Sequence, residues 1–127
     1  MLKGDALARS GKYDEALSAL DEAMRLDPQS ALLYDVRGVV RALADKPDEA
    51  SADFEKAIEL DPKFADPHAN LGIIRLAEED FIGALEYLNQ AIDVSPDFAI
   101  AHNARGVLYS NLKAWEQSVG RIFSSIS

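Results

Sequence analysis

The sequence contains no cysteine, which excludes a disulfide framework and thiolate chemistry. This absence fits a reducing compartment, so the cytoplasm is the default expectation for where the protein works. Nowhere does the chain approach the ~20 consecutive apolar residues of a membrane-spanning helix. Its first residues also lack the apolar core of a signal peptide. The sequence therefore predicts a soluble protein.

Positive charge is scarce as well. The chain carries 13 lysines and arginines against 22 acidic residues, which gives a net charge of −9. Binding to nucleic acid or to an anionic membrane requires clustered Lys and Arg, so neither is an expected partner. A negative field instead attracts proteins or peptides that present basic residues.

Glycine and proline are few, but they are regularly spaced. One glycine series recurs every 34 residues, at Gly4, Gly38, Gly72 and Gly106. Pro28, Pro62 and Pro96 share this period, and so do two series of alanines. A constant period of this length, kept without insertion, is typical of helical repeat proteins.

The sequence pattern of each repeat predicts two helices. In the second repeat, apolar periodicity predicts one helix over residues 31–43 and another that starts near Pro47 and ends at Leu60, before Pro62. Gly38 lies inside the first of these helices, where it allows the second to approach closely. In the fourth repeat we expect a first helix from about Phe98 to Leu112 and a second that starts at Trp115.

The repeated rows resemble the tetratricopeptide repeat, whose pattern places Leu-Gly, Tyr, Ala, Phe, Ala and Pro at set positions over 34 residues. The second repeat matches this pattern at Tyr34, Gly38, Ala50, Phe54, Ala57 and Pro62, and the third at Leu71, Gly72, Ala84, Leu88, Ala91 and Pro96. The resemblance implies an all-α fold, a right-handed α-solenoid of antiparallel helix pairs. We expect one domain over residues 1–127, with units at about 1–30 (partial), 31–64, 65–98 and 99–127 (incomplete). Both ends look cut, so we expect a fragment of a longer repeat protein.

Arginine departs from the family pattern in two rows, at Arg37, Arg41, Arg75 and Arg105. We interpret these side chains as packing with their methylene stems while the guanidinium reaches water or a carboxylate.

Candidate chemistry is sparse. His68 and His102 lie 34 residues apart, in one row, with no cysteine or third histidine to complete a zinc site. Their row packs against the neighbouring helix, which indicates a structural role. Acidic pairs such as Asp48 and Glu49 begin second helices, where they complement the helix dipole. The sequence therefore predicts no enzyme activity, no catalytic residue, no metal site and no cofactor.

The resemblance implies a concave inner face lined by the first helix of each pair. Its central row holds Val39, Ile73 and Val107, and polar residues flank this row at Asp35, Asp66, Asn70 and Asn103. Such a groove suits a peptide or partner helix with apolar side chains and some positive charge. The predicted function is a protein–protein interaction scaffold.

Family members that bind the acidic tails of Hsp70 and Hsp90 use a clamp of Lys, Asn, Asn, Lys and Arg. Read from the first unit, the matching positions hold Leu2, Asp5, Val36, Asp66 and Asn70; read from the second, they hold Asp35, Val39, Asn70, Ile100 and Ala104. Because acids stand where bases belong, the sequence argues against this ligand.

Self-assembly is the alternative function. The last segment of the chain carries apolar residues at Trp115, Ile122 and Phe123 and no polar capping helix after them. A second copy could cover these residues, so the alternative is an end-to-end structural unit, or a homodimer, that associates through the C-terminal end.

Overall fold

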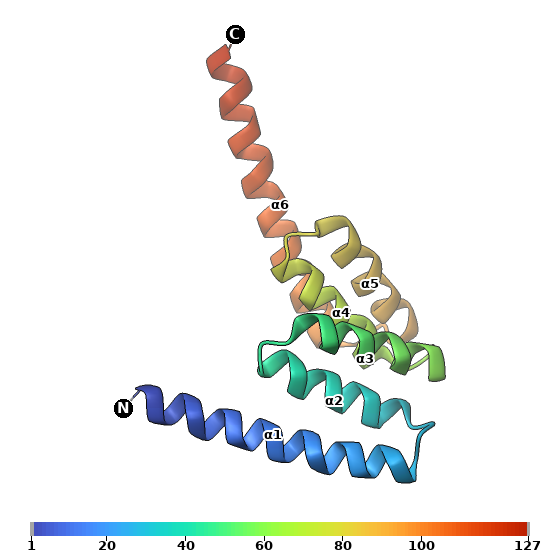
Figure 1. Cartoon of the computed structure of the whole chain (residues 1–127). Coiled ribbons are helices and arrows are strands. Elements are labelled where there is room, and N and C mark those ends of the chain that lie inside the picture. Colours follow the sequence, from blue (N-terminus) through green and yellow to red (C-terminus); the bar gives the residue numbers. More distant parts are fainter. Residues whose placement is uncertain (1, 127) are drawn as a thin grey trace.

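The computed structural model describes the backbone of residues 2–126 and the side chains of residues 11–121. Over that range the chain forms helices and no strand, which confirms the all-α prediction. The helices are α1 (Leu2–Leu26), α2 (Ala31–Leu43), α3 (Pro47–Leu60), α4 (Ala65–Ala77), α5 (Phe81–Val94) and α6 (Ala99–Ile126). They stack side by side along the chain, and the C-terminal half of α6 projects from the stack (Figure 1).

The second and third units are antiparallel helix pairs, α2 with α3 and α4 with α5 (Figure 1). The bounds predicted for the second unit are confirmed. Each sharp turn inside a pair uses a residue in the left-handed region, Asp45 and Glu79, both with φ of 62°. Helix starts are fixed locally: the Ser30 hydroxyl accepts from the Leu33 N–H, and the Asp80 carboxylate accepts from the Gly83 N–H.

The core of each pair depends on the glycine row. A Cβ at Gly38 would come within 2.6 Å of the Phe54 ring, and one at Gly72 within 2.7 Å of the Leu88 side chain. The large residue of the second helix therefore sits directly on the glycine of the first. The predicted close approach is confirmed for these two units, and their repeated alanines are fully buried around it: Ala50, Ala57, Ala84 and Ala91.

The fourth unit departs from the prediction. The expected break before Trp115 is wrong, because α6 runs without interruption from Ala99 to Ile126. In the third unit Glu79 forms the turn between the two helices and Asp80 caps the start of α5. Lys113 and Ala114 occupy the equivalent positions in the fourth unit. Both are good helix formers with no capping oxygen, so the local sequence favours continuing the helix.

The first unit is not a helix pair either. Helix α1 passes through Gly11, which stands in the turn row of Asp45 and Glu79 and remains helical here. No described atom outside the helix lies within 4 Å of a Cβ built at Gly11, so none of the described residues packs against α1 at that point to favour a turn. Within residues 2–126, none of the helices combines the length and apolar character that a membrane crossing requires.

Candidate peptide-binding groove

Helices α2, α4 and the first half of α6 are successive neighbours in the stack. Val39, Ile73 and Val107, one from each helix, are 37%, 40% and 53% exposed. We call these three residues the apolar strip. Leu32 and Ile100, from one further row of α2 and α6, are more than half exposed as well. Aliphatic side chains aligned on neighbouring helices and left exposed form a surface that a partner can bury.

Two of the predicted flanking residues contact each other. The Asn70 side-chain amide donates a hydrogen bond of 3.0 Å to the Asp35 carboxylate and so joins α4 to α2. Asp35 is only 5% exposed. Sequence reasoning placed both residues at the groove as ligand contacts, whereas in the structure the pair also fastens two successive units together.

Burial, together with the negative charge of nearby Asp66, raises the pKa of Asp35 to about 6. The hydrogen bond from Asn70 acts in the opposite direction and holds the pKa down. Asp66 itself is half-buried and Asn103 is exposed. Asp66 and Asn103 are therefore the flanking groups that are open to a ligand.

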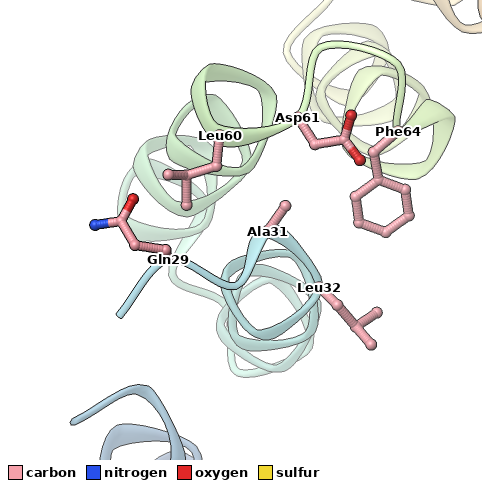
Figure 2. A pocket seen from close by; sticks show the side chains of 6 residues that line it. All are labelled: Gln29, Ala31, Leu32, Leu60, Asp61 and Phe64. Atoms are coloured by element: carbon pink, nitrogen blue, oxygen red, sulfur yellow. The ribbon is translucent and has the colours of Figure 1, made fainter. Parts of the chain in front are cut away.

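Hollows lie at both ends of α2. One, of about 540 Å³, opens where the α1–α2 connection meets the α3–α4 connection. Figure 2 shows Ala31 and Leu32 at the start of α2 beside Asp61 and Phe64 from the α3–α4 connection. The other, of about 370 Å³, has Ala42, Ile73 and Ala77 in its lining. Phe64 was missed by sequence reasoning because it lies just outside the predicted helices.

Of the arginines that break the family pattern, Arg37, Arg41 and Arg75 reach carboxylates, as predicted, whereas Arg105 reaches the amide oxygen of Asn89. The Nε and Nη2 groups of Arg37 donate to the two oxygens of Asp53 at 3.0 and 2.7 Å, and Nη1 donates to Asp21 at 3.0 Å. Arg41 donates to the same Asp53 carboxylate at 2.9 Å. Asp53 is buried, so this cluster joins α1, α2 and α3 and is not a ligand site.

Both histidines have structural contacts. The Nε2 atoms of His68 and His102 lie 3.0 and 2.7 Å from the carbonyl oxygens of Pro62 and Pro96, in the loops that precede their helices. In the part of the chain that the structure describes, no group of three His, Asp or Glu side chains could hold a metal ion.

The residues predicted for self-association lie on the second half of α6. Trp115 is 63% exposed, beside the start of α5. Ile122 and Phe123 lie outside the residues whose side chains the structure describes.

Stacked antiparallel helix pairs with a side-by-side row of first helices define a helical repeat scaffold, a class of protein-interaction modules that is generally non-enzymatic. The model of the tetratricopeptide repeat family matches residues 1–65 and 69–124. The chain belongs to the tetratricopeptide repeat family, which confirms the resemblance drawn from its sequence.

Solved structures agree on the fold. The first such domain of Spaghetti (RPAP3), bound to the HSP90 peptide SRMEEVD, is 23% identical with a TM-score of 0.74, over 87% of this chain and 88% of that one. The Arabidopsis OM64 domain is 22% identical with a TM-score of 0.75, over 86% and 90%. The Sgt2 domain from Aspergillus fumigatus is 20% identical with a TM-score of 0.77, over 90% and 76%. No match is found among curated proteins.

Proposed function

We propose that the chain binds a peptide or partner helix in the groove lined by α2, α4 and the first half of α6. The observation that carries this proposal is the apolar strip of Val39, Ile73 and Val107, which stays exposed on neighbouring helices. Burying one such side chain contributes roughly 1–2 kcal/mol, so three of them can support micromolar binding together with backbone hydrogen bonds.

The proposed ligand carries aliphatic side chains together with lysine or arginine. Asp66 and the net charge of −9 favour a cationic ligand. The HSP90 peptide in the Spaghetti complex has three acidic residues among seven. The positions that would clamp such a tail hold Asp66 and Asn70 here, so we do not extend this ligand to the chain.

Selection from a library of random ten-residue peptides tests the proposal. We expect the enriched sequences to combine aliphatic with basic residues. Enrichment of acidic sequences, or of none, would contradict it.

A substitution in the apolar strip tests whether the enriched peptides bind there. Ile73→Gln should weaken their binding at least tenfold in fluorescence anisotropy, because a polar side chain replaces a contact at the centre of the strip. Ile82→Gln on α5 is the matched control, since Ile82 is 77% exposed but lies away from the strip. Equal losses in the two variants would show that the groove is not the site.

Self-association through the C-terminal end is the second candidate, favoured by the exposure of Trp115. Light scattering over a hundredfold concentration range tests it, with an Ile122→Glu, Phe123→Glu variant alongside. A dimer that this variant abolishes would support the second candidate, and a monomer at all concentrations would exclude it.

A further inference from the structure

One face of α6 lacks the helix that covers the same face in the two complete units. We call it the open face and define it by His102, Arg105, Gly106 and Tyr109. No described atom outside α6 lies within 4 Å of a Cβ built at Gly106. Tyr109 is 51% exposed and His102 is exposed as well.

The third unit shows what normally happens to this face. There Leu88 of α5 rests on Gly72, His68 is 4% exposed, and Leu71 is fully buried. Leu71 packs against Phe54 of α3 and Tyr87 of α5. The open face of α6 therefore has the shape of a helix-packing surface, with its glycine in place and its covering helix absent.

The second unit shows which chemistry the open face fits, since it pairs Arg37 with Gly38 as α6 pairs Arg105 with Gly106. Arg37 uses Nη1 to bind the preceding unit at Asp21, and Nε and Nη2 to bind Asp53 on its own covering helix.

Arg105 reproduces the first half of this arrangement. Its Nη1 donates to Asn89 at 3.0 Å, and Asn89 stands in the row of Asp21. Within the described part of the chain, its Nε and Nη2 meet no acceptor. The two donors that Arg37 gives to the covering helix therefore remain available on α6.

The chain's own last segment does not match this face. Two repeats beyond Asp53, the position that would meet Arg105 holds Arg121. The like charges would repel each other, whether the segment came from the same chain or from a second copy. In the structure the segment continues straight out along α6 (Figure 1).

We infer that the open face binds an acidic amphipathic helix of a partner protein. The helix presents a carboxylate to Arg105 and a large apolar side chain to Gly106, with alanine one turn before and after. The template is α3, which presents Asp53 to Arg37 and Phe54 to Gly38 and carries the fully buried Ala50 and Ala57 one turn before and after. A bidentate guanidinium–carboxylate contact provides the specificity, and the apolar residue on glycine provides the buried area. This surface differs from the groove, so the inference goes beyond the proposed function.

A peptide with the sequence of residues 46–61 is the probe, because it carries the covering helix of the second unit. Isolated helices of this length are marginal in water. The peptide therefore carries the substitution Glu55→Lys, and a lactam bridge joins this lysine to Glu59 to hold the peptide helical. Both positions are exposed in the folded chain and face away from α2. In fluorescence anisotropy we expect the peptide to bind the full chain saturably, with a dissociation constant below about 1 mM.

Gly106→Leu should weaken this binding at least tenfold, because its side chain fills the place of Phe54. The open space around Gly106 makes the substitution harmless to the fold. Gly120→Leu is the matched control, since a Cβ there also meets no described atom, and it should leave binding unchanged. Circular dichroism checks that both variants fold.

A charge exchange tests the role of Arg105 directly. A peptide with Asp53→Arg should bind the natural chain at least tenfold more weakly and recover its binding to an Arg105→Asp chain. Recovery cannot result from general damage to the fold.

Three results would overturn the inference. The first is an absence of peptide binding at about 1 mM. The second is binding that Gly106→Leu and Arg105→Asp leave unchanged, as expected if the peptide replaces α3 in its own unit. The third is a dimer of the natural chain that Gly106→Leu dissociates, since a second copy would then occupy the face. Ile73→Gln should leave this binding intact, so a failure here is distinguishable from a failure of the groove.

Discussion

At the scale of single residues, the two complete units differ in the side chains that join their first helix to their second. Asp53 is buried and satisfied by Arg37 and Arg41. In the third unit the positions of Asp53 and Arg37 hold Tyr87 and Leu71, which pack in an apolar cluster. The position of Arg41 keeps an arginine, Arg75, which pairs with Glu78. The repeat therefore accepts an ionic or an apolar pair in one place, because the geometry of the helix pair is set by the glycine row.

Removing the buried carboxylate tests the ionic version. We expect Asp53→Asn to lower the free energy of unfolding by about 2–4 kcal/mol, since two partly buried guanidinium groups lose their shared partner. Urea denaturation measures the loss. Glu22→Gln, which breaks an exposed pair with Arg25, should leave the free energy of unfolding nearly unchanged. A double variant, Arg37→Leu with Asp53→Tyr, should recover at least half of the loss, and no recovery would show that the ionic cluster is not replaceable.

Asp35 gives the stability a pH dependence. Its pKa is about 6 in the folded chain, against about 3.9 when unfolded. The folded state therefore holds the proton more tightly. The stability that this contributes is complete below about pH 4 and is lost as the pH rises through about 6.

An Asp35→Asn variant removes this dependence and keeps the contact to Asn70. We measure the difference in free energy of unfolding between this variant and the natural chain. We expect this difference to shift in favour of the variant by about 1–2 kcal/mol between about pH 4 and pH 7, a value that includes a discount for solvent screening. Urea denaturation at several pH values measures it. A constant difference for Asp35→Asn would mean that the carboxyl titrates normally.

At the scale of helices, one glycine row has two different environments. Gly38 lies under the Phe54 ring, whereas the space around Gly106 is open. Sequence alone treats the two positions as equivalent, because they stand in one row with the same neighbour, arginine.

Alanine at the two positions should have opposite effects. Gly38→Ala should lower the free energy of unfolding by about 1–3 kcal/mol, since the new Cβ displaces Phe54. Gly106→Ala should raise it by about 0.5–1 kcal/mol, because alanine is the better helix former and meets no neighbour. Thermal melting of the two variants side by side measures both. A loss in both would show that a helix covers Gly106 after all.

At the scale of the whole molecule, the packed body ends within α6. Leu108 is fully buried, whereas the described side chains from Lys113 onward are exposed except for Val119. The second half of α6 therefore adds surface for partners and little to the core.

Truncation after Lys113 tests this division. We expect the free energy of unfolding to change by less than about 0.5 kcal/mol, while the helical circular dichroism signal falls with the lost segment. Leu108→Ala, in the packed half, should instead cost about 2–5 kcal/mol. A truncation that cost as much as Leu108→Ala would show that the segment packs on the body.

The sequence by itself determined the repeat, the helix pairs of units two and three, and the class of protein. These follow from local signals: proline and capping residues end and start helices, and glycine and alanine rows specify close packing. The exposed row of Val39, Ile73 and Val107 was predictable for the same reason, since a fixed period places equivalent residues on one face.

Only the tertiary structure decided which residues are engaged. It joined Asp35 to Asn70 and Asp53 to Arg37, contacts between residues that are distant in sequence and whose partners no period identifies. It also showed α6 continuing past Lys113 and leaving Gly106 uncovered. The physical reason is that a repeat pattern specifies what each face can pack against, while the turn and the opposing charges decide whether anything packs there.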